Sequence, residues 1–539
     1  MLILGIVEGH DANWAVVRDG QLLAAFEKER FSKTKHDGGD VSDFVPKTLD
    51  FLGINIEEVD LIATSEPVFR GLGTGITMVT GRRYTEIHDA VGQTVRYLGR
   101  TIPCISVPHH LAHASYARYT SPFSDVAVLT WDGGGDAYTE AAYSCATMSV
   151  WGDRLKSIVS ITNCGIGSLW HIVSKAIFDD GNAAGKLMAL AALGRPHLIG
   201  DLADRVLAPM RTPLQGIWSI KDCWPDEDRP PLLHGSSRWQ EPMAQDVAYA
   251  VQFLTTQTCL ALAQGAIELA SVNHIATSGG VALNGYVNSA LRELEGVDDA
   301  HVPPAVHDGG LAAGAALFAW HEALGNEYRP SPSRELAALG LSYTPDDVVE
   351  AARGAKLVSR YLGQEEAVAE AVDRIASGQV IGWYEGRSEH GPRALGQRSI
   401  LARADSVTVR DRINQTIKRR EVFRPLAPAV LASRAHEYFD IKFNSPFMLY
   451  IVDVLREGRQ LLPGIVHRDG TARVQTVDPA TSLGRICAGV GMATGQPVVI
   501  NTSLNVQAPI AETPADAMQV LSGSGLDALI ANEHLILRR

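Results

Sequence analysis

Short apolar runs alternate with polar turns at three places between residues 2 and 291. Residues 2–32 hold three such runs, and the pair Asp19-Gly20 separates the second run from the third. An Asp-Gly pair between two β-rich runs is typical of a two-residue hairpin turn. Residues 125–148 and 274–291 repeat the scheme, because each begins with an apolar run that ends in a glycine-rich turn. The pattern predicts three strand–turn units.

Helical tracts lie between and after these units. Residues 241–270 predict a long helix, and short strands combined with long helices favour an α/β domain. A seam rich in proline, serine and glycine follows at residues 325–347. Beyond it, a predicted helix at 364–379 leads into a predicted strand at 380–386, where a second α/β unit starts. We therefore place a first domain at residues 1–340 and a second at residues 341–539.

Composition narrows the class of protein. The chain has 539 residues, 46% of them hydrophobic and 20% charged, and a net charge of −13. That charge argues against a protein whose main task is to bind a nucleic-acid backbone. The six cysteines form no C-x-x-C motif, which disfavours a zinc ribbon or a disulfide framework. With no signal-peptide pattern and no apolar run of about 18 residues, we expect a cytoplasmic protein that does not bind membranes.

Three histidines cluster in residues 107–120. His109 and His113 are four residues apart, so on a helix they share one face and could hold a metal ion. No glutamate stands beside the first histidine, unlike the zinc-protease motif. From spacing alone, a packed histidine cluster that includes His110 is favoured over a metal site, and both interpretations stay open.

Glycine-rich turns recur at the ends of the predicted strands. Such turns expose backbone N–H groups that can surround an anion, although each one alone is also an ordinary β-turn. Their repetition favours nucleotide binding of the kind found in the actin/hexokinase-like fold. The residues singled out are Asp132, Gly133, Gly134, Gly279, Gly280, Asn284 and Asp308.

Basic residues crowd two stretches of the second domain, 385–402 and 418–430. Arginine suits bidentate phosphate contacts and keeps its charge when buried, so the stretches predict a polyanion pocket, against an alternative of structural ion pairs. Arg473 and the strand end at 501–503 join this set. The basic residues of the two stretches are Arg387, Arg393, Arg398, Lys418, Arg419, Arg420 and Arg424.

Over nearly its whole length the chain resembles the O-carbamoyltransferases of the nodulation and antibiotic-tailoring type. The motifs that carry the resemblance include "VPHHLAHASYA", "WDGGGD", "SGGVALNG", "HDGGLAAGAA", "GRSEHGPRALGQRSILA", "KRREVFRPLAPAV" and "NTSLN". The resemblance implies an actin-like (ASKHA) first domain, similar to tRNA threonylcarbamoyl transferases, and a YrdC-like α/β second domain. It also implies that carbamoyl phosphate and ATP give carbamoyl adenylate and pyrophosphate in the second domain. An acceptor hydroxyl then takes the carbamoyl group in the first.

The resemblance also implies roles for single residues. The metal ligands would be His109, His113, Asp132 and Asp308, holding iron(II) or another divalent ion. Arg393, Lys418, Arg424 and Arg473 would bind carbamoyl phosphate and the phosphates of ATP, which enters with magnesium, while Asn501 and Ser503 would face the nucleotide. We expect His10 to be the general base on the acceptor and Lys35 to lie near the anionic intermediate. In the first domain Gly133, Gly134, Gly279, Gly280 and Asn284 would contact nucleotide.

Two alternative functions remain at this point, a tRNA threonylcarbamoyl-adenosine enzyme and a kinase-like nucleotide-binding protein of the actin fold. The acidic composition argues against tRNA, and a kinase would leave the arginine-rich second half unexplained. A hydrogenase-maturation carbamoyltransferase is excluded because such enzymes carry zinc fingers and this chain has no C-x-x-C motif.

We expect a hydroxyl-bearing natural product as acceptor. Loops around 66–85 and 213–243 would contact this acceptor, but their sequence does not indicate which compound it is. Oligomeric state is not predicted. "NTSLN" departs from the family pattern at Leu504, where phenylalanine is usual.

Overall fold

The computed structural model describes residues 1–65, 77–78, 93–133, 137–139, 142–143, 146–151, 155–161, 166–200, 237–330 and 335–539. The chain forms two compact units. The first comprises Met1–Ala25 and Gly38–Arg334, and the second comprises Phe26–Asp37 and Glu335–Arg539. The segment 26–37 therefore belongs with the second unit, whereas the sequence boundary near residue 340 assigns it to the first.

The first unit contains two sheets with the same strand plan. In one sheet β1 pairs antiparallel with β2 and parallel with β4, and β4 pairs parallel with β7. In the other, β8 pairs antiparallel with β11 and parallel with β13, and β13 pairs parallel with β14. Outer strands extend both sheets, in the orders β3-β2-β1-β4-β7-β6-β5 and β12-β11-β8-β13-β14. This duplicated arrangement is that of actin-like proteins, and the predicted fold class is confirmed.

The strands of the first sheet are β1 (Leu2–Val7), β2 (Asn13–Arg18), β3 (Gln21–Glu27), β4 (Leu61–Thr64), β5 (Thr77–Met78), β6 (Gln93–Tyr97) and β7 (Arg100–Ser106). Those of the second are β8 (Val126–Trp131), β11 (Ala146–Trp151), β12 (Leu155–Ile161), β13 (His274–Ser278) and β14 (Asp299–His301). A separate pair is formed by β9 (Ala137–Thr139) and β10 (Ala142–Tyr143). The longer helices of the unit are α2 (Val45–Phe51), α3 (His109–Thr120), α4 (Ile166–Phe178), α5 (Ala184–Ala191), α8 (Pro242–Ala270), α9 (Gly285–Arg292) and α10 (Leu311–Phe318).

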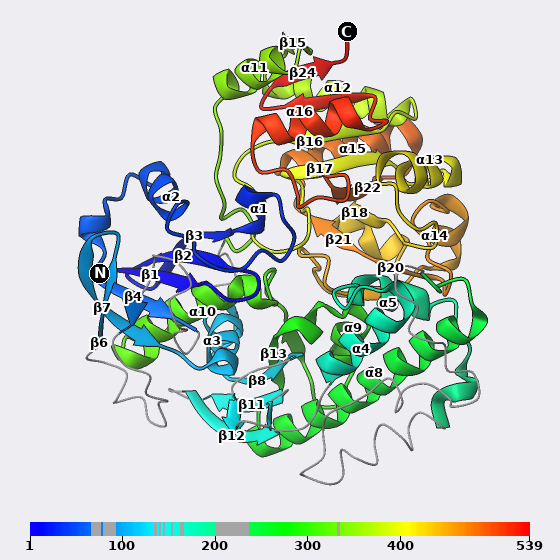
Figure 1. Cartoon of the computed structure of the whole chain (residues 1–539). Helices are drawn as coiled ribbons and strands as arrows, with labels where there is room; N and C mark the ends of the chain where they lie inside the picture. The colour runs from blue at the N-terminus through cyan, green and yellow to red at the C-terminus, as the bar shows by residue number, and fades with distance from the viewer. Residues whose placement is uncertain are drawn as a thin grey trace. The chain divides into compact units, whose positions relative to one another are not determined.

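Helices α3 and α10 pack closely on each other and connect the two sheets of the first unit. α10 lies against β1, β2 and β4, and α3 lies against β8 and β13 (Figure 1). Small residues allow this close approach, because a Cβ added at Gly314 would come within 2.0 Å of the Ala112 carbonyl oxygen. The start of α3 is thereby held at the carboxyl ends of β8 and β13.

The second unit is built on one eight-stranded mixed sheet, in the order β15-β24-β23-β16-β17-β22-β18-β21. Its strands are β15 (Val358–Tyr361), β16 (Ile381–Tyr384), β17 (Arg398–Arg403), β18 (Ala427–Leu431), β21 (Gln475–Val477), β22 (Val498–Ser503), β23 (Ala528–Ala531) and β24 (His534–Leu537). Two further strands, β19 (Ile451–Asp453) and β20 (Thr471–Arg473), pair with each other. This is the α/β unit that the resemblance implies as YrdC-like.

Side chains alternate between two cores across this sheet. On β17, Leu401 faces one core, which includes residues of α12 (Gln364–Ala376) and α15 (Ser482–Thr494). Its neighbours Ile400 and Ala402 face the other, which includes residues of α11 (Pro345–Gly354) and α16 (Pro514–Gly523). The period of two along each strand produces this division. Shorter helices are α1 (Glu29–Ser32), α13 (Val407–Arg412) and α14 (Arg456–Leu461).

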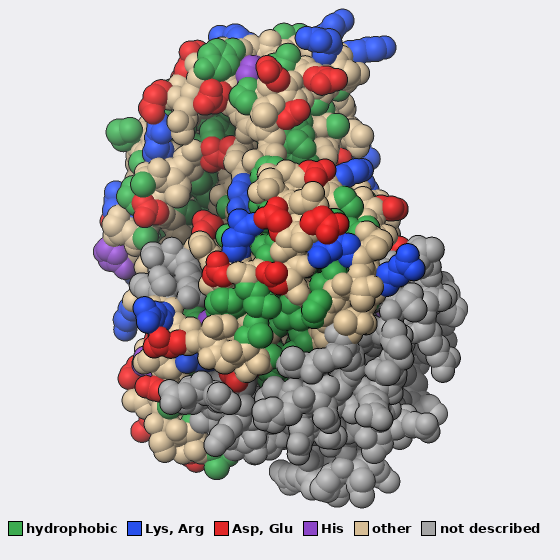
Figure 2. All heavy atoms as spheres, turned by 90° about the vertical axis from the view of Figure 1, so that its left-hand side faces the viewer, with side chains coloured by type: hydrophobic (Ala, Val, Ile, Leu, Met, Phe, Trp, Pro, Cys, Tyr) green, Lys and Arg blue, Asp and Glu red, His purple; other side chains and the backbone are tan. Residues whose placement is uncertain are grey.

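Surface character agrees with the composition. On the face drawn in Figure 2, the described acidic and basic side chains are interspersed, and no extended basic patch gathers there. Among the described residues, no helix combines the length and the apolar character needed to cross a membrane. Cys104, Cys259 and Cys487 are buried.

Candidate functional site

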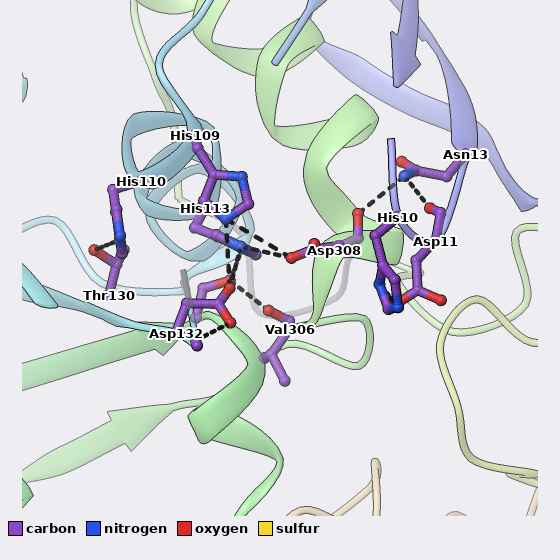
Figure 3. Close-up of polar contacts among 12 residues, drawn as sticks. His10, Asp11, Asn13, His109, His110, His113, Thr130, Asp132, Val306 and Asp308 are labelled. Atoms are coloured by element: carbon purple, nitrogen blue, oxygen red, sulfur yellow. Dashed lines mark hydrogen bonds and ion pairs between the residues drawn. The ribbon is translucent and has the colours of Figure 1, made fainter. Parts of the chain in front are cut away.

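Four predicted metal ligands of the first unit converge in the structure. His109 and His113 lie on the first turns of α3, Asp132 directly follows β8, and Asp308 starts a short helical turn before α10 (Figure 3). One ligand atom from each residue lies within 4.8 Å of the other three. We call these four residues the His–Asp cluster. His110, between the two histidines, instead lies 3.1 Å from the Thr130 hydroxyl.

Distances within the His–Asp cluster are those of groups around a common cation. His113 Nε2 lies 3.0 Å from Asp132 Oδ2 and 3.3 Å from Asp308 Oδ1. His109 Nε2 lies 3.4 Å from Asp132 Oδ2 and 3.8 Å from Asp308 Oδ1. Ligands held about 2.1 Å from one ion are about 3 Å apart, so the spacing fits a divalent metal. Burial alone would raise the pKa of Asp132, but the two neighbouring histidines outweigh burial and hold this pKa well below its usual range.

A serine fixes the tautomer of His113. The Ser278 hydroxyl donates to the Val306 carbonyl at 3.1 Å and lies 3.2 Å from His113 Nδ1. Because a hydroxyl has one proton, Ser278 must accept from Nδ1–H. Nε2 of the neutral ring then carries a lone pair toward two carboxylates, and this buried atom has no hydrogen-bond partner among the described residues. A cation between these groups removes that repulsion, so the residues present fit a metal ion.

The glycine pair after β13 makes room for the His–Asp cluster. Gly279 has φ +97, and a Cβ there would lie 2.2 Å from the Trp131 carbonyl oxygen. A Cβ at Gly280 would lie 2.9 Å from Asp132 Oδ1. The Gly133 amide donates to the same Asp132 oxygen at 2.6 Å. These three glycines shape the end of β8, and their predicted nucleotide contacts stay predictions. Gly134 lies outside the described residues.

Asn284 is occupied by internal contacts. Its side chain caps α9 by accepting from the amides of Tyr286 and Val287, at 3.2 and 3.3 Å. It also exchanges two hydrogen bonds with the Gln252 amide, at 3.0 and 3.2 Å. Capping by asparagine is a common structural role. Its prediction as a nucleotide ligand gains no support from this geometry.

His10 lies in the turn between β1 and β2, beside Asp11 (Figure 3). His10 Nδ1 is 3.1 Å from Asp11 Oδ2, and this hydrogen bond raises the pKa of His10 above its ordinary value. Asn13 donates to the carbonyls of Asp11 and Asp308, at 2.7 and 2.9 Å. Asn13 thereby ties the turn of His10 to the turn of a His–Asp cluster member. Neither Asn13 nor Ser278 is among the site residues predicted from the sequence, although Asn13 begins β2 and Ser278 ends β13.

The second unit brings five basic side chains together. These are Arg393, Lys418, Arg420, Arg424 and Arg473, which we call the cation cluster. Burial and the charge of Arg424 lower the pKa of Arg393 to about 10. Burial and the charges of three arginines hold the pKa of Arg473 well below its usual range. Among the described residues, no carboxylate lies within ion-pair distance of either arginine, and the Nε atom of each is buried without a partner. The site is therefore rich in unneutralised positive charge.

Lys418 is held firmly within the cation cluster. Its ammonium donates to the Ser503 carbonyl at 2.5 Å and hydroxyl at 3.1 Å, and also to the Asn505 side chain. Burial, and then the charges of Arg420, Arg424 and Lys35, lower its pKa well below the ordinary value. Lys35, in the segment 26–37, thus lies close enough to Lys418 to lower its pKa, and its predicted place near the anionic intermediate stays a prediction. Arg424 has one acidic neighbour, Glu421, at 3.8 Å.

Three other basic residues of the predicted pocket have structural contacts. Arg387 donates to the carbonyls of Leu339 and Gly340. Arg398 is fully buried, stacks over Tyr384 at 3.8 Å and donates to four backbone carbonyls. Arg419 is exposed and donates to the Gly523 carbonyl. The glycine- and proline-rich surroundings in the sequence therefore did not distinguish arginines that bind backbone carbonyls from arginines that belong to the cation cluster.

Asn501 and Ser503 end β22 at the same place. Asn501 is fully buried and donates to the Gln475 side chain at 2.7 Å and to the Ala394 carbonyl at 3.3 Å. Ser503 donates to the Asn505 side chain at 2.8 Å. Both therefore orient neighbours of the cation cluster, and their predicted nucleotide contacts stay predictions. The acceptor loops predicted around 66–85 and 213–243 lie mostly outside the described residues.

Comparisons with known proteins agree with this picture. A family model described as carbamoyltransferase N-terminus matches residues 74–317, and one described as carbamoyltransferase C-terminus matches residues 372–538. Nodulation protein NolNO of Sinorhizobium fredii (strain NBRC 101917 / NGR234) is 30% identical over 98% of this chain and 79% of its own length. The 3'-hydroxymethylcephem-O-carbamoyltransferase of Streptomyces clavuligerus is 29% identical over 94% of this chain and 93% of its own.

Among solved structures, full-length HypF in its phosphate- and nucleotide-bound form aligns with 61% of this chain and 56% of that chain, at 14% identity and a TM-score of 0.34. The two family models together cover most of the chain, and NolNO aligns with nearly all of it. The chain therefore belongs to the carbamoyltransferase family and is a transferase enzyme.

Proposed function

We propose that the protein is an ATP-dependent O-carbamoyltransferase that activates carbamoyl phosphate as carbamoyl adenylate and transfers the carbamoyl group to a hydroxyl of a natural product. The observation that carries the proposal is the cation cluster. Five buried or half-buried positive charges, with one acidic neighbour within ion-pair distance in the part of the chain that the structure describes, suit a site that brings several phosphate groups together. The names of the relatives, a nodulation protein and a cephem O-carbamoyltransferase, support a hydroxyl acceptor.

Two groups leave in the activation step, the phosphate of carbamoyl phosphate and the pyrophosphate of ATP. Carbamoyl adenylate keeps only the α-phosphate of ATP, so the phosphate of carbamoyl phosphate has to leave. Water first releases phosphate and leaves carbamate, and a carbamate oxygen then attacks the α-phosphorus. The bond between the α- and β-phosphates breaks, and pyrophosphate departs with its electron pair. Arg393, Lys418, Arg424 and Arg473 bind the anions and neutralise charge as it develops, which is the main contribution expected of a protein in such chemistry.

In the transfer step the acceptor hydroxyl attacks the carbamoyl carbon, the bond to AMP breaks, and AMP leaves. His10 accepts the hydroxyl proton at the ring nitrogen that does not face Asp11. Its raised pKa brings a histidine closer to neutral pH, which suits a general base. The His–Asp cluster would hold a divalent ion such as iron(II). Such an ion supplies Lewis-acid chemistry when bound, by polarising an oxygen. Asn13 keeps the turn of His10 fixed to the turn of Asp308.

Trapping of the intermediate tests the proposal without knowledge of the acceptor. Hydroxylamine attacks the carbamoyl carbon of carbamoyl adenylate and gives hydroxyurea and AMP. With ¹³C-labelled carbamoyl phosphate and ATP, we expect labelled hydroxyurea together with AMP, pyrophosphate and phosphate in equal amounts. A reaction without ATP and a reaction with Arg393→Ala measure the uncatalysed background. If ADP accumulates in place of AMP, or if hydroxyurea forms equally without ATP, the proposal is wrong.

A further inference from the structure

Both peptide groups of Gly391 are held by the segment 26–37, which belongs to the second unit. The Gly391 amide donates to Glu27 Oε1 at 2.7 Å, and Arg30 Nη2 donates to the Gly391 carbonyl at 2.6 Å. Both side chains are buried, Glu27 with 5% and Arg30 with 2% of their surface exposed. Gly391 has φ +100, a conformation that side chains disfavour. The segment therefore fixes the backbone two residues before Arg393.

The backbone directly after Arg393 is fixed as well. Asn501 donates to the Ala394 carbonyl at 3.3 Å, and Glu389 Oε1 accepts from the Leu395 amide at 2.8 Å. These two contacts hold the oxygen and the nitrogen of one peptide group. Glu389 Oε1 also accepts from the amides of Gln397 and Arg398. Arg393 thus lies between two fixed points of the chain.

The rest of the segment is attached to the same unit. Lys33 forms an ion pair with Asp516, the carboxylate that caps the start of α16. The same lysine donates to the Arg30 carbonyl at 2.5 Å. Lys35 follows two residues later and acts electrostatically on Lys418. The segment therefore reaches the cation cluster from a part of the sequence about 360 residues away in chain order, as the pairing of Glu27 with Gly391 shows.

We propose that residues 26–37 form a positioning strap for the cation cluster, in which Glu27 and Arg30 set the place of Arg393 for binding a phosphorylated substrate. The inference rests on the proposed function of the cation cluster. Like charges repel one another, so the cluster needs backbone restraints to stay arranged for an anion before the anion arrives. Preorganisation of this kind depends on the residues that support the binding groups. Glu27 and Arg30 touch the loop and not the ligand, and are positioning residues.

Affinity for inorganic pyrophosphate, measured by calorimetry on the full chain, tests the strap. Glu27→Ala removes the acceptor for the Gly391 amide, and we expect it to weaken binding about tenfold, since small misplacements of a binding group are costly. Glu27→Gln keeps an acceptor oxygen and should remain within about threefold of the wild type. Asp527→Ala is the matched control. Asp527 also accepts from a backbone amide of this unit, that of Val380 at 2.7 Å, but none of its hydrogen bonds reaches residues 389–398.

Thermal unfolding without ligand shows whether each variant is folded. If Glu27→Ala does not fold, Arg30→Met and Arg30→Lys replace the pair, because lysine keeps a donor for the Gly391 carbonyl and methionine does not. Wild-type affinity in the folded variant that lacks the contact overturns the strap, as does an equal loss in Asp527→Ala. Rescue by the conservative variant supports it. A wild-type chain that binds no pyrophosphate overturns the proposed function of the cation cluster itself, so the two failures are distinguishable.

Discussion

His113 Nδ1 lies 3.2 Å from the hydroxyl of Ser278, a residue 165 positions away, and this contact directs the other ring nitrogen toward Asp132 and Asp308. The Ser278 proton is engaged by the Val306 carbonyl, which leaves the serine only the role of acceptor. A single hydrogen bond therefore sets the form of His113 that can bind a metal ion.

We expect removal of His113 to weaken metal binding strongly and removal of His110 to leave metal binding unchanged. After dialysis against manganese(II), we expect about one ion per wild-type chain and an affinity at least about a hundredfold weaker in His113→Ala. His110→Ala is the control, because His110 is equally buried but faces Thr130. Metal content is measured by mass spectrometry. Equal metal content in both variants would contradict the assignment of the His–Asp cluster.

Ser278→Ala weakens metal binding without removing a ligand. The ring of His113 loses the acceptor that fixes its tautomer, and loss of such a partner typically lowers metal affinity about 10–100-fold. The same dialysis experiment measures this effect. We expect manganese(II) to restore full occupancy at high concentration in Ser278→Ala but not in His113→Ala. An unchanged affinity in Ser278→Ala would show that the tautomer is set in another way.

Asn284→Ala lowers stability and leaves nucleotide use intact. The variant loses the cap of α9 and both hydrogen bonds that Asn284 exchanges with the buried Gln252 amide, which together cost about 2 kcal/mol of the free energy of unfolding. Denaturant unfolding measures the loss. The KM for ATP should stay at the wild-type value. A large rise in that KM with unchanged stability would restore Asn284 as a nucleotide ligand.

Pyrophosphate binding weakens as pH rises toward the alkaline range. Lys418 is charged only below its pKa, and burial together with Arg420, Arg424 and Lys35 lowers that pKa well below 10.5. The positive charge that attracts the anion is therefore lost at a lower pH than for an exposed lysine. Calorimetry between about pH 7 and pH 10 measures the decline. In Lys418→Arg the charge persists, so any decline that remains belongs to other groups; identical profiles would contradict the role of Lys418.

Local patterns in the sequence predicted the parts of the structure that depend on neighbouring residues. The Asp19-Gly20 hairpin is confirmed, with φ of +50 and +79 at the two residues. The predicted helix at 241–270 is confirmed as α8, Pro242–Ala270. His109 and His113 share a helix face as their spacing indicates, with ring centroids 4.8 Å apart.

Contacts between residues far apart in the sequence could not be predicted in this way. Ser278 and Glu27 each act on a partner more than a hundred positions away, and no local pattern names that partner. The roles of arginines in similar turns could not be distinguished from the sequence either. Arg398 donates to backbone carbonyls, whereas Arg393 belongs to the cation cluster. The folded surroundings of each arginine, and not its neighbours in the sequence, decide which carbonyls it can reach.

Under the proposed function, activation uses the cation cluster, and transfer uses a separate set of residues, His10 and the His–Asp cluster. The most direct test is pyrophosphate release from ATP, with and without carbamoyl phosphate and with no acceptor, in the wild type, Arg393→Ala and His113→Ala. We expect release that depends on carbamoyl phosphate in the wild type and in His113→Ala, and its loss in Arg393→Ala. Release that does not depend on carbamoyl phosphate would contradict the formation of carbamoyl adenylate. Release that is lost equally in both variants would contradict the separation of the two sets of residues.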